Sequence, residues 1–242
     1  MVELAQAKED ALRNLSAAEG AVASRASKPP LDERREPDPI DMHILSEWDA
    51  TQLFDHYHKS MNAFIILLDP FLHKVDYVRS TSAVLFTSIL AVSAKFIRPD
   101  LYKPLLMSAK QLVGRGIIDG KVSVALVQSI LLQVYWKEPD DCSAWLRVGE
   151  AIRMGYQLHL HTYRTTPLPG DEFEARLLLD RERTWIDLCA FDQTFFLQSG
   201  DEEDTFHQTC MIPHYRINVK DWLKETAKYG VADDREQGAD FE

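Results

Sequence analysis

The chain has 242 residues, 45% of them hydrophobic and 10% aromatic, which is enough to bury a substantial core. Its formal net charge is -11, and no long run of lysine and arginine offsets that charge locally. We therefore expect no direct nucleic-acid binding by this chain alone. The longest apolar run, residues 63–68, is too short to span a membrane, and the N-terminus lacks an apolar signal segment, so we expect an intracellular protein.

Residues 1–40 are expected to form a flexible linker. Alanine, charged residues and several prolines dominate this stretch, which leaves few large apolar side chains to offset the entropy of ordering it. A heptad-like spacing of leucine, alanine and valine also permits a short coiled coil. Residues 41–242 are expected to form one helical domain.

The first predicted helix begins near Ser46, because Ser46 and Asp49 have the spacing of a capping box. Its apolar face is expected to contain Trp48, Leu53, Phe54, Tyr57 and Met61. Pro70 then interrupts an apolar segment, which predicts a buried connection rather than a continuous helix. Further helices are predicted over Thr81–Phe96, Tyr102–Val113, Val122–Trp136, Ser143–Leu160 and Glu174–Leu197.

Two features of these helices indicate how they pack. Residues 122–136 are apolar on nearly every side, which predicts a central helix surrounded by others. Gly114 is expected to end the helix before it. Because the chain has only 10 glycines, a turn-rich β fold is unfavourable, and the sequence predicts an all-α multi-helix bundle or array.

No motif in the chain predicts catalysis or metal binding. The segment 114–123 lacks the spacing and the preceding strand of a phosphate-binding loop. The paired histidines at 56/58 and 159/161 would diverge on a helix, and the acidic run 201–204 has the pattern of a solvated loop. Three dispersed cysteines predict free thiols. We therefore expect no enzyme activity, no catalytic residue, and no cofactor or metal in this chain.

The segment 174–200 carries Arg181, Trp185 and Asp192 on one stripe of a largely apolar helix. A carboxylate in such surroundings must be paired or hydrogen-bonded. We expect Asp192 to pair with Arg153 on the preceding helix, since Arg181 lies about three turns, or roughly 16 Å, away along its own helix. Trp145 and Trp185 are expected in the core, as aromatic side chains at helical spacing usually are.

The order of these segments resembles a known family. LLQVYWKEPDDCSAWLRVGEAIRMGYQLHLH (131–161), followed by RERTWIDLCAFDQTFFLQSG (181–200), is similar to the fungal-specific transcription factor domain, or middle homology region, of zinc binuclear cluster regulators. LFDHYHKSMNAFIILLDPFL (53–72) resembles the entry to that domain. The positions that match the family signature are Trp145, Arg153, His161, Arg181, Arg183, Trp185 and Asp192.

The resemblance implies a helical regulatory and interaction domain located in the nucleus. It implies transcriptional co-regulator proteins or a small effector as partners, and it allows a homodimer. The family reads DNA through an N-terminal six-cysteine zinc cluster, which three scattered cysteines cannot form, so zinc is expected only in that missing module. The family continues beyond the matched helix, so residues 41–242 are expected to be a domain truncated at its C-terminus.

A second interpretation from a different class stays open. An all-helical enzyme or small-ligand carrier would use an interhelical pocket, which we would expect near His159, His161 and Asp192. A deep cavity with converging polar groups would favour that alternative.

Overall fold

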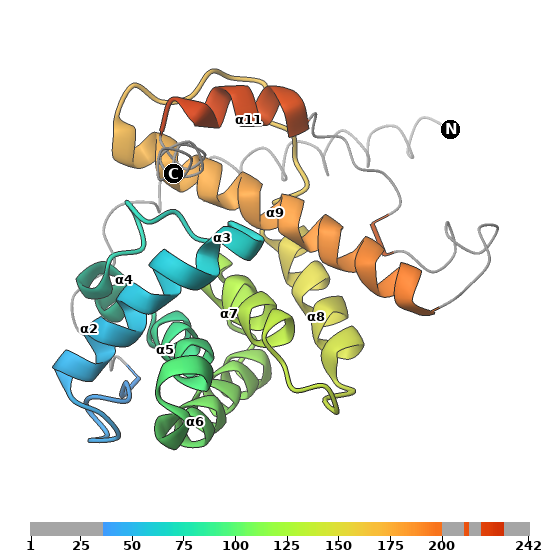
Figure 1. The fold of residues 1–242 in the computed structure, drawn as a ribbon. Coiled ribbons are helices and arrows are strands. Elements are labelled where there is room, and N and C mark those ends of the chain that lie inside the picture. The colour runs from blue at the N-terminus through green and yellow to red at the C-terminus, as the bar shows by residue number, and fades with distance from the viewer. Residues whose placement is uncertain (1–35, 200–210, 213–218, 230–242) are drawn as a thin grey trace, which may run out of the picture. The chain divides into compact units, whose positions relative to one another are not determined.

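The computed structural model describes residues 36–199, 211–212 and 219–229, and in these ranges the protein is all-α (Figure 1). The predicted fold class is therefore confirmed. The elements are α2 (Glu47–His56), the π-helix η1 (Tyr57–Met61), α3 (Asn62–Ile65), α4 (Val75–Thr81), α5 (Ala83–Ile97), α6 (Pro99–Ile118), α7 (Val124–Tyr135), α8 (Ala144–Gln157), α9 (Glu172–Ser199) and α11 (Val219–Ala227). Within the described ranges, no helix combines the length and the apolar character that crossing a membrane requires.

The ordered body begins inside the predicted linker. Residues 1–35 of that linker, and with them the possible coiled coil, lie outside the described ranges. The compact unit that holds the helices starts at Pro37. Asp38 is fully buried and accepts hydrogen bonds from Arg79 Nε at 2.8 Å and from the backbone N–H of Ile40 at 2.8 Å. This buried charge pair ties the segment 37–41 to α4.

Helix α2 begins as predicted. Ser46 Oγ accepts the N–H of Asp49, and the Asp49 carboxylate accepts the N–H of Ser46, which completes the capping box. Leu53 and Phe54 are buried, as expected. The prediction for Trp48 is wrong, because its side chain is 69% exposed and projects from the first turn, before the helix meets the core.

The connection after α3 is buried and non-helical, as Pro70 predicted. Leu67, Leu68 and Leu72 are buried there. Asn62 holds the turn: its side chain donates to Leu68 O at 2.7 Å and accepts from Leu68 N at 3.1 Å. Ile66 ends α3 with a φ of 50°, a left-handed conformation that a β-branched side chain rarely adopts.

The middle of the chain forms the helix pair α5 and α6 with α7 beside them. Ser82 caps α5, and Pro99 stands at the first turn of α6, so α5 ends where the sequence predicted. Gly114 does not end the next helix, which continues to Ile118. A glycine costs a helix interior only about 1 kcal/mol, and Gly116 gives the Leu126 side chain of α7 room to approach. The short helix α4 was not predicted.

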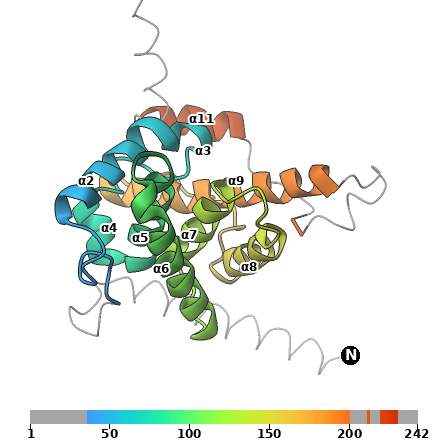
Figure 2. The same cartoon turned by 60° about the horizontal axis from the view of Figure 1, so that its bottom comes forward.

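Helix α7 is central, as predicted, and packs against α5, α6, α8 and α9. Its buried residues run without a break from Leu126 to Val134. Helix α9 crosses α7 and α8, and the second view shows it behind the α5–α7 group (Figure 2). Where α8 and α9 touch, Leu158 meets Arg181 and Gly155 meets Leu188, so the two helices run in opposite senses.

Candidate functional site

Several signature residues gather where the end of α8 meets α9. The Trp185 ring lies 5.2 Å from the Tyr156 ring and 6.0 Å from the His161 ring, measured between centroids. Gly155 makes this packing possible, because a Cβ there would stand 2.9 Å from a Leu188 methyl carbon. Trp185 is 4% exposed, so its predicted core position is confirmed.

Arg181 and His161 complete this corner. Arg181 Nη2 donates to Leu158 O at 2.7 Å, at the C-terminal end of α8, where helix carbonyls lack partners and favour a cation. His161 is exposed beyond the end of α8, and its ring lies 4.9 Å from the Tyr156 ring between centroids, tilted by 51°. Arg181 does not contact Asp192, as the helical spacing predicted. The corner is therefore a structural joint between two helices.

Trp145 and Arg153 do not belong to that joint. Trp145 is 66% exposed, so its predicted core position is wrong. Gly149 and Ile152, which lie on the same side of α8 as Trp145, are buried, so Trp145 is exposed because it stands in the first turn of the helix. Arg153 is exposed, and no hydrogen bond or ion pair joins it to Asp192 in the described part of the chain.

Asp192 is a buried anchor, but its partner is backbone rather than an arginine. The side chain is 9% exposed and accepts the N–H of Ile212 at 2.9 Å, with the backbone of Met211 as a second contact. Burial raises the pKa of Asp192, and these two backbone hydrogen bonds oppose the rise. The predicted Arg153 pair is thus wrong, and Asp192 instead fixes residues 211–212 against α9.

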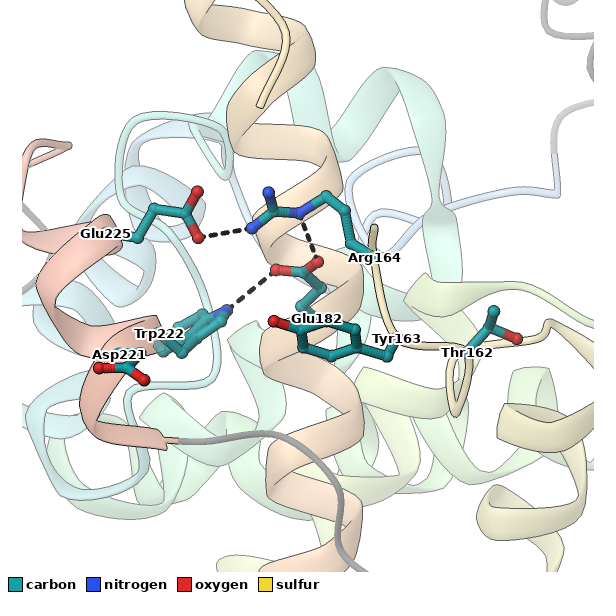
Figure 3. A pocket seen from close by; sticks show the side chains of 7 residues that line it. All are labelled: Thr162, Tyr163, Arg164, Glu182, Asp221, Trp222 and Glu225. Carbon is teal, nitrogen blue, oxygen red and sulfur yellow. Dashed lines mark hydrogen bonds and ion pairs between the residues drawn. The ribbon is translucent and has the colours of Figure 1, made fainter. Parts of the chain in front are cut away.

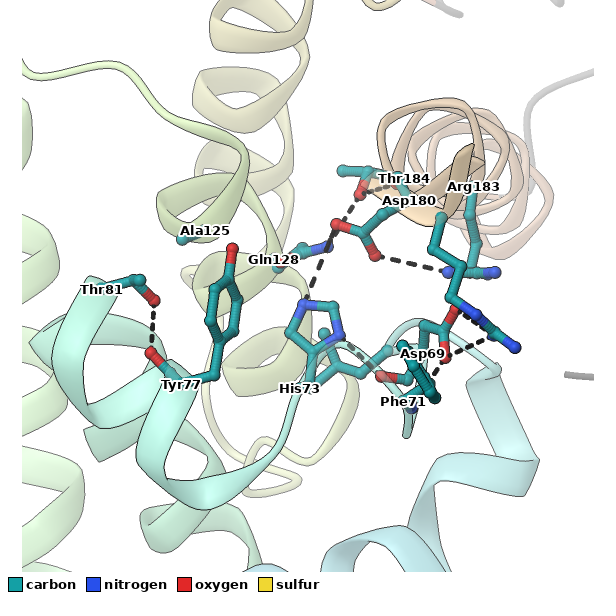
Figure 4. A network of polar contacts seen from close by, with 12 residues as sticks. Asp69, Phe71, His73, Tyr77, Thr81, Ala125, Gln128, Asp180, Arg183 and Thr184 are labelled. Carbon is teal, nitrogen blue, oxygen red and sulfur yellow. Dashed lines mark hydrogen bonds and ion pairs between the residues drawn. The ribbon is translucent and has the colours of Figure 1, made fainter. Parts of the chain in front are cut away.

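Arg183 enters a buried polar network that links α9 to α7 and to the connection before α4 (Figure 4). Arg183 Nη1 donates to Asp180 Oδ1 at 3.3 Å. Gln128 Nε2 of α7 donates to Asp180 Oδ2 at 2.9 Å and to Thr184 Oγ1 at 3.1 Å. His73 Nε2 lies 3.9 Å from Asp180 Oδ2. Asp180 therefore collects contacts from three separate segments.

A second buried pair extends this network. Arg176 Nη1 donates to Asp69 Oδ2 at 3.0 Å, and the Arg176 guanidinium lies 4.4 Å from the Phe71 ring centroid. Asp69 O in turn contacts His73 Nδ1 at 3.0 Å. A buried pair of this kind contributes specificity of packing more than net stability, because both charges lose their hydration. It holds the non-helical connection against α9.

This network was not predicted from the sequence. Asp180, Arg183, Thr184 and Asp187 recur at spacings of three and four residues, which places polar groups on one stripe of α9. This spacing of polar residues in a largely apolar helix was the only sequence pattern that could have indicated the network. The pattern was ambiguous, because a polar stripe that faces solvent has the same spacing.

Asp187 differs from its neighbours because its carboxyl lacks a hydrogen-bond partner in the described part of the chain. Its Oδ2 atom is sealed from solvent. Burial raises the pKa of Asp187 to about 8; Arg183 opposes this rise and Asp180 adds to it. Arg183 Nε and Nη2 are also buried without partners. Unsatisfied buried groups are uncommon and mark places where a water or a ligand belongs.

A cavity of about 400 Å³ opens beside Asp187. It lies among α3, the end of α7 and α9, and its described lining residues are Phe64, Ile65, Val134, Tyr135, Lys137, Asp187, Ala190, Phe191 and Thr194. This volume lies within the usual range of small-molecule pockets, roughly 300 to 1,000 Å³. The pocket is therefore the candidate binding site of the chain, and it does not include His159, His161 or Asp192, where the alternative interpretation placed one.

A smaller hollow of about 70 Å³ lies under α11 (Figure 3). Arg164 donates to Glu182 at 2.9 Å and to Glu225, and Trp222 Nε1 donates to Glu182 Oε2 at 3.1 Å. These groups pair with one another across α9, α11 and the segment before α9. These hydrogen bonds and ion pairs attach α11 to α9 and to the segment before α9, and they occupy the polar groups of the hollow.

One histidine pair is placed on a helix as expected, and the other is not. His58 Nε2 contacts His73 O at 3.0 Å, so it belongs to the packing of η1. His159 lies after the end of α8 with a φ of 55°, so the helical spacing assumed for His159 and His161 does not apply. In the described ranges, no three histidine, cysteine or acidic side chains group as metal ligands would. The acidic run 201–204 lies outside those ranges.

The fold and these sites define an all-α protein with a buried polar network and a pocket lined by the Asp187 carboxyl. In sequence it is similar to Protein priB of Lentinula edodes, a fungal protein, with 35% identity over 167 residues, or 67% of this chain. The match covers 27% of that relative, so the chain spans about a quarter of its length. No protein-family model and no solved structure matches the chain.

Proposed function

We propose that the chain is a regulatory and interaction domain of a fungal transcription factor. It acts in the nucleus through co-regulator proteins or a small effector, and it does not bind DNA by itself. One observation carries the proposal: segments that resemble the fungal regulators but are far apart in sequence, at 155–161 and 181–185, contact each other at the α8–α9 corner. Similarity to a fungal protein over two thirds of the chain is consistent with this assignment.

The charge of the chain supports partners other than nucleic acid. A net charge of -11 repels phosphate backbones, and DNA affinity depends on phosphate neutralisation by lysine and arginine. We expect purified chain to show no sequence-specific DNA retention at physiological salt. Sequence-specific retention of DNA at nanomolar concentration would contradict the proposal that this chain does not bind DNA without a separate zinc cluster.

A tethering experiment tests the regulatory role. The full chain is fused to an unrelated DNA-binding domain in a fungal host, with a reporter gene behind the cognate sites. We expect the fusion to change reporter transcription relative to the DNA-binding domain alone. Trp185→Ala should abolish the change because it removes a core side chain, whereas Trp48→Ala, which removes an exposed one, should preserve it.

An unchanged reporter would contradict the proposal if the fusion protein is present, nuclear and folded. A fusion that accumulates at the same level as the DNA-binding domain, enters the nucleus and leaves the reporter unchanged has no regulatory activity to assign. Proteolysis of the purified fusion confirms that the chain is folded in that case.

A further inference from the structure

The cavity beside Asp187 has walls that suit an apolar molecule. Phe64, Ile65, Val134 and Phe191 line it together with the Tyr135 ring. The aromatic rings also contact one another: Tyr135 and Phe191 have centroids 6.1 Å apart. Aromatic faces attract cations as well as apolar groups, so such a frame accepts a positively charged ligand with an apolar body.

Among the polar groups of the cavity, the Asp187 carboxyl offers an acidic position for a ligand. Lys137 Nζ donates to the backbone oxygens of Glu138 at 3.3 Å and Asp141 at 3.0 Å. Thr194 Oγ1 donates to Ala190 O at 2.8 Å. Asp187 and Tyr135 are the lining residues whose side-chain polar groups make no hydrogen bond in the described part of the chain, and the acidic one of the two is Asp187. A ligand group that pairs with a carboxylate would satisfy it.

The backbone next to the cavity is irregular. The π-helix η1 precedes α3, and Ile66, directly after α3, has a left-handed backbone conformation. Interruptions of this kind are frequent at functional sites, because regular helix would not place the side chains in the same way. Here they set the positions of Phe64 and Ile65 on the cavity wall.

We propose that this cavity binds a small apolar amine, whose ammonium group pairs with the Asp187 carboxylate and whose apolar body lies against Phe64, Tyr135 and Phe191. The site goes beyond the regulatory role proposed above, and it can exist whether or not the chain acts in transcription. The charge of the ligand follows from Asp187 and from the acidic balance of the chain.

Binding should release a proton. The titratable groups that interact electrostatically with Asp187 are Arg183, Asp180 and Cys189 on α9 and Tyr57 on η1, and Lys137 lies on the same cavity wall. Because burial raises the pKa of Asp187 to about 8, the empty site holds its proton at pH 6 and must lose it to pair with an ammonium group. Affinity should therefore rise about tenfold per pH unit from pH 6 towards pH 8.

Isothermal titration of the purified full chain tests this site with three probes of one shape. Phenethylamine carries the ammonium group, 2-phenylethanol is its neutral counterpart, and 3-phenylpropanoate carries a negative charge. We expect saturable binding of the amine, at least about tenfold weaker binding of the alcohol, and none of the acid. Repeating the titration in buffers of different ionisation enthalpy measures the proton that is released.

Two variants locate the site. Asp187→Asn should remove both the preference for the amine and its pH dependence, whereas Asp119→Asn, which removes an exposed acid at the end of α6, should leave both unchanged. Ala190→Leu places extra carbon atoms into the cavity from an exposed wall position and should block all three probes.

Four results would overturn the assignment. They are equal affinity for the amine and the alcohol, no saturable binding of the amine, amine binding by Asp187→Asn as tight as by the parent, and full binding by Ala190→Leu. Because the titration needs no transcription, a silent reporter with a functional amine site would reject only the regulatory proposal. An active reporter without amine binding would reject only the site.

Discussion

The Asp187 carboxyl should make the stability of the protein depend on pH in a direction opposite to that of an ordinary ion pair. In the unfolded chain this group ionises near its ordinary pKa of 3.8, whereas burial holds its pKa in the folded protein at about 8. Between these values, folding takes up a proton. The contribution of Asp187 is therefore most favourable below pH 4 and is lost as the pH rises towards 8.

The magnitude follows from the width of that interval. Each pH unit within it costs the parent protein about 1.4 kcal/mol of unfolding free energy, which sets an upper limit of about 6 kcal/mol over the whole interval. Asp187→Asn keeps the shape of the protonated carboxyl and cannot ionise. We therefore expect the variant to match the parent below pH 4, to be more stable than the parent already at pH 5, and to gain further on the parent up to pH 8.

Urea unfolding of parent and variant at half-unit steps between pH 5 and pH 8 measures this difference directly. Other titrating groups are common to both proteins, so they cancel when the two free energies are subtracted. Asp119→Asn serves as a control with the same change in formal charge, and its difference from the parent should stay flat. If the Asp187→Asn difference is also flat, or favours the parent at pH 8, the carboxyl is not buried as described here.

Other substitutions test the corner and the anchor. Asp192→Ala should cost about 1 to 3 kcal/mol, because it leaves the N–H of residue 212 buried without a partner, and hydrogen exchange at that amide should accelerate; unchanged exchange would contradict the anchor. Trp185→Ala should cost about 3 to 5 kcal/mol in urea unfolding, whereas Trp145→Ala should change stability by less than about 0.5 kcal/mol; equal effects would reject the assigned packing. Gly155→Ala should destabilise by about 1 to 3 kcal/mol through its contact with Leu188, while Gly114→Ala, which meets nothing within 4 Å, should stabilise the helix by up to about 1 kcal/mol; thermal melts that rank them the other way would contradict the close approach of α8 and α9.

Local signals in the sequence predicted most of the helices. The capping box at Ser46 and Asp49 satisfies backbone groups within one turn, so its residues alone specify it. The sequence of α7 predicted a central helix because apolar residues lie on nearly every side of it, so no one face could turn to water. Gly114 misled the boundary prediction, since the α6–α7 packing compensates for the weak helix propensity of glycine.

Placement of individual side chains was less predictable. Trp145 and Trp185 have the same chemistry and both lie on helices, yet one is exposed and the other is buried. Which face of α8 turns inward depends on where α9 crosses it, and that crossing is a long-range property. The partner of Asp192 was missed for the same reason, because residues 211–212 reach it from beyond the end of α9.

The sequence by itself determined the all-α class, the buried connection at Pro70 and the need of Asp192 for a hydrogen-bond partner, because these follow from backbone propensity and from the cost of burying a polar group. Only the tertiary structure decided which partners those polar groups meet. Asp180 gathers Gln128 and His73 from segments more than 50 residues away, and Asp187 is left unpaired beside an aromatic cavity. Such placements depend on how whole helices cross, and no local pattern of residues encodes a crossing.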